Sequence, residues 1–185
     1  MAGPLQGVVV LDLSRILAGP WATQVLADFG AEVIKVEHPR GGDDTRSWGP
    51  PYLKNEAGLD TSESAYYLSA NRGKRSVAID IATAEGQSLV RRLATQADVL
   101  VENYKVRGLA RYGLAYEDLA SLNPRLVYLS ISAFGQDGPA AAEPGYDAMI
   151  QAMGGLMSLT GVPDGEPGAG PQKAGVAVAD PMCGM

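Results

Sequence analysis

Apolar residues in this chain gather in short runs separated by longer stretches of mixed polarity. The first run, residues 7–13 (GVVVLDL), is nearly continuous and rich in β-branched residues. Such a run is typical of a strand that is buried on both faces. By the same pattern, further strands are predicted at residues 31–37, 76–81, 97–102, 125–132 and 174–179.

Helices are predicted between these strands, where turn residues bracket segments with one apolar face. Gly19-Pro20 opens the first segment and Gly30 closes it, since proline favours the first turn of a helix and glycine the position after its end. Thr83 is suited to cap a helix at residues 83–96. Other helices are predicted at residues 65–71, 108–112, 116–122 and 146–159. The repeated alternation predicts an α/β fold with a mostly parallel sheet.

Two segments lack a clear period or end abruptly. Residues 38–64 are rich in Gly, Pro, Asp and Ser, which predicts a long loop that is functional or mobile. Methionines at every fourth position of residues 146–159 are interpreted as core packing. Asp180-Pro181 is typical of an N-cap followed by the first helical residue, yet the sequence stops at Met185. We therefore expect a truncated chain.

Composition narrows the functional classes. The chain has 185 residues, of which 46% are hydrophobic, and a net charge of −6, so a disordered chain and a globally basic nucleic-acid surface are both excluded. No stretch approaches the ~20 apolar residues of a membrane span, and we expect a cytoplasmic protein without a membrane or nucleic-acid partner. A single cysteine, Cys183, and a single histidine, His38, exclude a disulfide framework and a multi-histidine metal centre. No bound metal is expected.

Candidate reactive groups are few. Neither a phosphate-binding loop nor GxGxxG follows the first strand, so Glu37, which stands where a dinucleotide-binding protein places its ribose acid, is interpreted as a surface carboxylate. Asp43 and Asp44 are interpreted as part of a solvated turn. Cys183 is either a nucleophile or a small buried hydrophobe, and its sequence context favours the second. Asp180 is either an N-cap or a nucleophile, and its position alone favours the cap.

Basic residues follow several predicted strands. In an open α/β sheet, ligands bind beyond the carboxyl ends of the strands, so these residues indicate a polyanionic ligand such as a nucleotide phosphate. The alternative is that they form an ordinary solvated surface. The residues are Arg15, Lys35, His38, Arg40, Arg46, Arg72, Lys74, Arg75, Lys105, Arg107 and Arg111.

Long segments of the chain resemble the class III CoA-transferases, the CaiB/BaiF family, which also includes α-methylacyl-CoA racemases. The segments include PLQGVVVLDLSRILAGPWATQVLADFGAEVIKVEHPRGGDDTR, NRGKRSVAIDI, ADVLVENY, LNPRLVYLSISAFGQDGP, GYDAMIQAMGGLMSLTG and GVAVADPMCGM. The resemblance implies that residues 1–185 form the N-terminal, Rossmann-like part of a large domain, without the small domain and the C-terminal return of the chain. It also implies an interlocked homodimer for the full-length protein.

The resemblance assigns functional residues one by one. Asp180 takes the place of the catalytic aspartate. His38 stands where relatives carry an arginine, and Ala82 where some carry a lysine. The resemblance implies CoA contacts at Leu17, Ala18, His38, Arg40, Ile79, Ala82, Asn103, Tyr104, Lys105, Arg111, Gly145 and Tyr146.

Tyr146 separates the two activities of the family. The racemases carry a histidine at this position as one of two acid–base groups. A tyrosine, with an ordinary pKa near ~10, is poorly matched to proton transfer at neutral pH, so CoA transfer is favoured.

The implied partners are an acyl-CoA and a carboxylic acid, with the CoA thioester as a substrate and no tightly bound cofactor. Asp180 would attack the thioester to give a mixed anhydride, and the CoA thiolate would then form an enzyme–CoA thioester. The alternatives are a racemase and a non-catalytic CoA-binding fragment.

Overall fold

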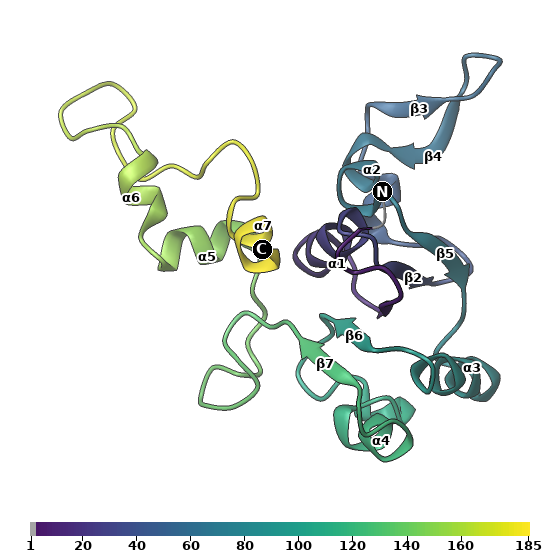
Figure 1. Cartoon of the computed structure of the whole chain (residues 1–185). Coiled ribbons are helices and arrows are strands. Elements are labelled where there is room, and N and C mark those ends of the chain that lie inside the picture. The colour runs from purple at the N-terminus through teal and green to yellow at the C-terminus, as the bar shows by residue number, and fades with distance from the viewer. Residues whose placement is uncertain (1–2) are drawn as a thin grey trace.

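The fold is built on a parallel sheet of five strands, seen in a computed structural model that describes residues 3–185 (Figure 1). The strand order is β5-β2-β1-β6-β7, and every neighbouring pair is parallel. The strands are β1 (Val9–Asp12), β2 (Glu32–Glu37), β5 (Arg75–Ala78), β6 (Val99–Glu102) and β7 (Val127–Ser130). The predicted fold class is therefore confirmed.

The direction of strand addition reverses between β1 and β6. The chain adds β2 and β5 on one side of β1, and then returns to add β6 and β7 on the other side. In doubly wound sheets a crevice opens at this switch point, beyond the carboxyl ends of the strands. A ligand site is therefore expected beside the turns that follow β1 and β6.

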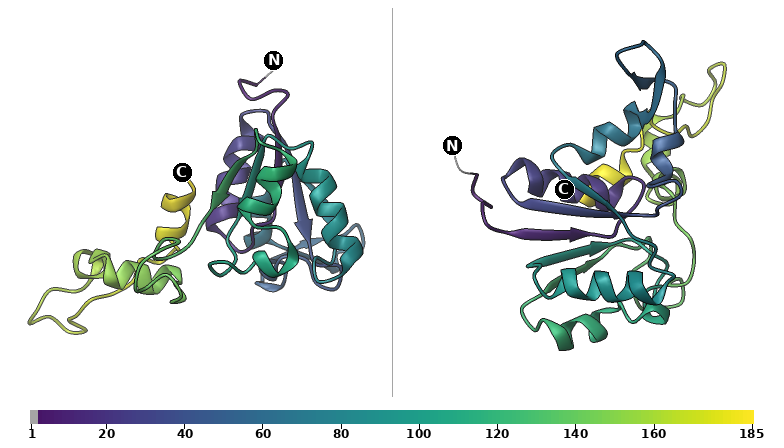
Figure 2. Two further views of the ribbon diagram at one scale, coloured as in Figure 1. Left: turned by 90° about the horizontal axis from the view of Figure 1, so that it is seen from below. Right: turned by 90° about the vertical axis from the view of Figure 1, so that its right-hand side faces the viewer.

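Helices cover both faces of the sheet (Figure 2). Successive residues of β1 point to opposite faces: Val10 packs in a cluster beside α1 (Ala18–Asp28), and Leu11 packs in the larger cluster with α3 (Ala84–Ala94) and α4 (Tyr116–Leu122). The predicted cap of α3 is confirmed, because the Thr83 hydroxyl accepts the N–H of Gly86 at 3.0 Å. A short 3-10 helix, η2 (Ala110–Tyr112), lies between β6 and α4.

Residues 38–64 are more ordered than the sequence predicts. They hold a 3-10 helix, η1 (Asp44–Ser47), and an antiparallel hairpin of β3 (Tyr52–Lys54) and β4 (Asp60–Ser64). The prediction of a continuous loop is therefore wrong. The hairpin leads into α2 (Ala65–Asn71), whose first turn is capped by the Ser64 hydroxyl.

The last third of the chain also departs from the prediction. The single helix predicted at residues 146–159 is split into α5 (Asp147–Met153) and α6 (Leu156–Thr160), because Gly154-Gly155 interrupts it and Gly155 has a φ of 81°. The methionines are not core residues, since Met149 and Met153 are 36% and 67% exposed.

The structure shows no strand at residues 174–179, where one is predicted. The segment from α5 to α6 extends away from the sheet, and the chain then returns so that α7 (Ala179–Gly184) packs along α1 (Figure 1). Gly184 allows this approach, because a Cβ at that position would lie 2.5 Å from the carbonyl oxygen of Ala18. Within residues 3–185, no helix has both the length and the apolar character needed to cross a membrane.

Candidate functional site

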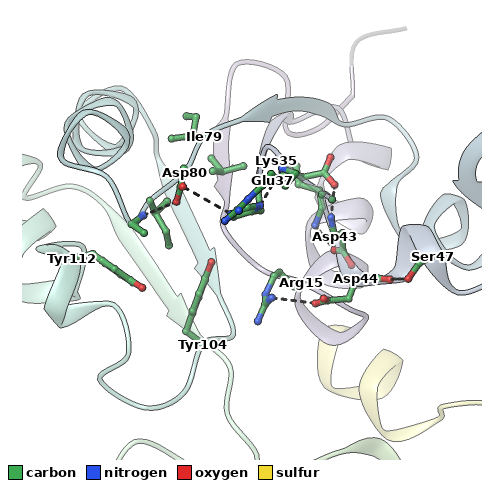
Figure 3. A pocket seen from close by; sticks show the side chains of 17 residues that line it. Arg15, Lys35, Glu37, Asp43, Asp44, Ser47, Ile79, Asp80, Tyr104 and Tyr112 are labelled. Carbon is green, nitrogen blue, oxygen red and sulfur yellow. Dashed lines mark hydrogen bonds and ion pairs between the residues drawn. The ribbon is translucent and has the colours of Figure 1, made fainter.

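A cavity of about 620 Å³ opens beyond the carboxyl ends of the strands, at the switch point of the sheet (Figure 3). Its walls come from the β1–α1 turn, the end of β2, the segment around η1, the β5–α3 connection and the residues after β6. Of the residues assigned to CoA binding by resemblance, those that line it are His38, Arg40, Ile79, Ala82 and Tyr104. These five residues belong to three separate connections of the chain, and the fold places them at one cavity.

An aromatic wall closes one side of the cavity. Tyr104 and Tyr112 both line it, and the Arg15 guanidinium lies 5.5 Å from the centroid of the Tyr104 ring. Arg111 lies outside the lining and stacks over Tyr112 at 4.6 Å. Flat rings beside guanidinium groups can bind a ligand that combines a ring with anionic groups.

The cations of the cavity differ in how tightly they are paired. Arg15 pairs with Asp44 at 3.2 Å, and the side chains of both are about half exposed. His38 Nε2 lies 4.0 Å from Asp80 Oδ2, an ion pair only when the imidazole is protonated. The Arg40 side chain has no ion-pair partner within residues 3–185 and is therefore free to meet an anion.

Glu37 is not the surface carboxylate that the sequence suggests. Only 6% of the residue is exposed, and its carboxylate accepts two hydrogen bonds from Arg46, at 2.9 Å and 2.7 Å. Burial alone would raise the pKa of Glu37, but the hydrogen bonds from Arg46 and Ser76 outweigh it and lower the pKa to about 2. Because its oxygens are occupied in this way, Glu37 anchors the cavity wall and is not available to bind a ribose.

Four charged side chains lie fully buried below the cavity, a feature that sequence reasoning missed. The Nζ atom of Lys35 is 2.9 Å from Asp43 Oδ2, and that of Lys74 is 3.0 Å from Asp12 Oδ2. The solvated-turn interpretation is therefore wrong for Asp43, which is 1% exposed. A signal was present in the sequence, since Lys35 stands between the apolar residues Ile34 and Val36 in the middle of a predicted strand.

Two clamps hold the backbone of the turn after β1. Asn103 Oδ1 accepts the N–H of Arg15 at 2.8 Å, and Asn103 Nδ2 donates to the carbonyl oxygen of Arg15 at 2.7 Å. Asp43 accepts the N–H of Ile16, with both carboxylate oxygens at 3.2 Å. Leu17 and Ala18, which follow this turn, are buried at the start of α1.

Asp180 lies in the first turn of α7 and is not its N-cap, so that interpretation is wrong. The capping acceptor is Asp147, whose Oδ1 accepts the N–H groups of Ala179 at 2.7 Å and of Asp180 at 3.2 Å. Gln151 holds Asp147 in place by donating to its other oxygen at 2.6 Å. The carboxylate of Asp180 has no hydrogen-bond or ion-pair partner in the described part of the chain, and burial and the charge of Asp147 raise its pKa.

Two other groups respond to the charge of Asp180. The pKa of Tyr66 is raised by burial and by Asp180 and Asp147, and the Tyr66 ring meets Trp48 edge to face at 5.2 Å. Cys183 is exposed, so the interpretation as a buried hydrophobe is wrong. Partial desolvation of its sulfur and the charge of Asp180 raise the pKa of the thiol, which disfavours the thiolate needed for a cysteine nucleophile.

The remaining assigned residues are not gathered at the cavity. Lys105 and Gly145 are exposed and do not line it, and Tyr146 is 71% exposed at the start of α5. Within residues 3–185, no cluster of His, Cys, Asp and Glu side chains is arranged to hold a metal ion.

Comparisons with known proteins agree on one family. The family model described as CoA-transferase family III matches residues 5–185. The chain is 58% identical to the succinate–glutarate CoA-transferase of Agrobacterium fabrum over 98% of its own length and 44% of that protein. It is 47% identical to the human succinyl-CoA:glutarate CoA-transferase, of which it covers 39%.

A solved structure shows the same fold. A CaiB/BaiF family protein from Brucella suis is 56% identical, with a TM-score of 0.89 over 97% of this chain and 46% of that one. The chain thus spans less than half the length of the relatives it matches.

Proposed function

The chain belongs to CoA-transferase family III, and on this premise we propose that the protein moves CoA from an acyl-CoA donor to a carboxylic acid acceptor. The observation that carries the proposal is the state of Asp180. Its carboxylate is partly buried, lacks a partner within residues 3–185 and has a raised pKa. A carboxylate of this kind is a better nucleophile than one held by a cation, because its electrons are not engaged elsewhere and its basicity is higher.

The proposed reaction proceeds through two covalent states of Asp180. A carboxylate oxygen attacks the thioester carbonyl, the C–S bond breaks, and CoA leaves as the thiolate, which gives a mixed anhydride. The thiolate then attacks the aspartyl carbonyl and releases the donor acid as its carboxylate, which gives an enzyme–CoA thioester. The acceptor carboxylate reverses both steps, so no proton or water is consumed.

Asp147 and Gln151 would orient the nucleophile. Asp147 accepts the N–H groups at the start of α7, and Gln151 is 2% exposed and also receives the N–H of Ala174 at 2.9 Å. These contacts fix the helix turn that carries Asp180. They also occupy the N–H groups of Ala179 and Asp180, so these two groups are not free to stabilise an oxyanion.

The cavity at the switch point is the proposed site for the nucleotide end of CoA. Ile79, Ala82 and the two tyrosines supply apolar and aromatic surface for the adenine, and Arg40 and Arg15 supply positive charge for the phosphates. Lys105 and Arg111, which are exposed near Tyr104 and Tyr112, are proposed to extend this positive charge along the ligand.

Short dicarboxylates are the substrate class that we propose. One relative is named succinate–glutarate CoA-transferase, a second succinyl-CoA:glutarate CoA-transferase and a third acetyl-CoA:oxalate CoA-transferase. We also propose that residues 1–185 form the N-terminal part of the large domain and that the full-length protein is an interlocked homodimer.

Covalent trapping tests this function. The protein is incubated with acyl-CoA compounds that include succinyl-CoA and then treated with hydroxylamine. The proposal predicts a hydroxamate on the peptide that contains Asp180, detected by mass spectrometry. Asp180→Asn should abolish the adduct, and Asp164→Asn, in an exposed loop, should leave it unchanged. Exchange of the substrate α-proton in D₂O without any adduct would instead favour the racemase.

A further inference from the structure

The turn between β1 and α1 is held in a conformation that its sequence disfavours. Ile16 has a φ of 69°, in the left-handed region. A β-branched residue rarely adopts this region, because its Cβ crowds the neighbouring carbonyl group, and such residues persist only where surrounding contacts hold them. The turn therefore depends on contacts from other side chains to keep its conformation.

Four side chains supply these contacts: Asp12, Lys35, Asp43 and Asn103. Ser14 donates its N–H to Asp12 at 2.9 Å and accepts from the Nζ atom of buried Lys35 at 2.9 Å. Asn103, directly after β6, binds both backbone polar groups of Arg15, and Asp43 accepts the N–H of Ile16. The backbone of these consecutive residues is thus bound by side chains and not by a regular turn.

The start of α1 depends on the same turn. A Cβ at Gly19 would lie 2.3 Å from the Cβ of Ser14, so the helix begins in direct contact with the turn. Leu17, at the N-cap position, offers no side-chain cap to the first N–H groups of α1. Any movement of the turn would therefore move Arg15 in the cavity wall together with the start of α1.

We propose that Asn103 is a positioning residue, which holds the strained β1–α1 turn in the shape that binds CoA without itself carrying the contact. The proposal rests on the function proposed above. Its basis is that both the oxygen and the nitrogen of the Asn103 amide are engaged by the backbone of Arg15, whose guanidinium lines the cavity. Asp43 is the less suitable residue to test, because its removal would leave Lys35 buried without a counter-charge.

The test compares two asparagine variants of the whole chain by calorimetric titration with coenzyme A. Asn103→Ala should weaken the affinity about tenfold, because the turn would relax in the free variant and CoA binding would have to restore its shape, at a cost of about one net hydrogen bond. Asn123→Ala is the matched control. Asn123 is also partly buried, and it donates to the backbone carbonyl groups of Ala94 and Ala97 at 3.0 Å and 2.8 Å. It lies near the amino ends of β6 and β7, whereas the cavity lies beyond the carboxyl ends of the strands. Asn123→Ala should lower the melting temperature without changing the affinity.

A second substitution separates positioning from direct contact. Asparagine tolerates a positive φ far better than isoleucine does, so Ile16→Asn should keep the turn in shape when the clamp is absent. The double variant Asn103→Ala with Ile16→Asn should therefore recover a large part of the lost affinity. Amide hydrogen exchange should also show faster exchange at residues 15 and 16 in Asn103→Ala and restored protection in the double variant.

The outcomes are distinct. Unchanged affinity in Asn103→Ala would overturn the proposal, and so would lost affinity that Ile16→Asn does not recover, because Asn103 would then contact CoA directly. If the wild-type chain binds no coenzyme A, the proposed function fails, and the assignment of the turn to CoA fails with it. Loss of turn protection in Asn103→Ala would still be visible by hydrogen exchange in that case.

Discussion

The ion pair of Arg46 with Glu37 is expected to be a major source of stability in the N-terminal half of the sheet. Its two hydrogen bonds are made where the Glu37 side chain is 4% exposed and that of Arg46 18%. The pKa of Glu37 falls from 4.5 to about 2, and each pKa unit corresponds to about 1.4 kcal/mol. Ser76 and the backbone N–H of Asp43 also contribute to this shift. Arg46→Met leaves Glu37 buried without its cation, and it should lower the free energy of unfolding by about 3 kcal/mol at pH 7, the usual cost of breaking a buried pair.

The sign of the pH dependence follows from the lowered pKa. A carboxyl group whose pKa is lower in the folded state contributes its full stability above its unfolded pKa, near 4.5, and loses it as the pH falls through about 2. The difference between wild type and Arg46→Met should therefore be largest above about pH 5 and should shrink toward pH 2. Urea unfolding, followed by the fluorescence of Trp21 and Trp48, measures it at each pH.

A matched control makes this prediction easy to refute. Arg75 also pairs with a glutamate, Glu32, but its side chain is 77% exposed, so Arg75→Met should cost less than about 1 kcal/mol. If Arg46→Met costs no more than Arg75→Met, or if its effect does not change between pH 7 and pH 3, then Glu37 and Arg46 do not form the buried pair that the structure shows.

Three further predictions concern other parts of the chain. Thr83→Ala removes the cap of α3 and should lower the free energy of unfolding by about 1 kcal/mol, measured by urea unfolding. Gly184→Ala should cost about 1 to 3 kcal/mol, because its Cβ would strike the first turn of α1, whereas Gly175→Ala, in open space, should be tolerated. Cys183 should react with iodoacetamide only at alkaline pH, and Asp180→Asn should shift the midpoint of that reaction to lower pH, because it removes the charge that helps to raise the pKa of the thiol.

Most of the sheet could be predicted from the sequence because its determinants are local. A β-branched apolar run such as residues 7–13 has few alternatives to a buried strand, and Thr83 caps a helix that begins next to it. The hairpin of β3 and β4 could not be predicted, because a segment rich in Gly, Pro and Asp has the composition of a loop whether or not its strands pair. The split between α5 and α6 had a local signal, Gly154-Gly155, which the regular spacing of the methionines concealed.

The candidate site could also be predicted only in part from the sequence. His38 and Arg40 were predicted from their position after a strand and from the resemblance, and both line one cavity. The catalytic role of Asp180 stays a prediction. The cap of α7 was missed because it comes from Asp147, more than thirty residues earlier in the chain. A local sequence pattern does not indicate a contact at that separation. The burial of Asp43 depends on Lys35 in a neighbouring strand, and such a pair is visible only after the chain has folded.

These contacts divide the charges at the carboxyl edge of the sheet into two groups with different roles. The buried pairs, such as Lys35 with Asp43, cannot exchange partners, since either group left alone would lose its solvation without compensation, and they therefore fix the backbone of the β1–α1 turn. The exposed pair of Arg15 with Asp44 holds its partners by about 1 kcal/mol or less, so an incoming phosphate can take the place of the carboxylate at little cost. A rigid turn can thus present a side chain that is free to change partners, and this combination suits a site that binds and releases a polyanion in every cycle.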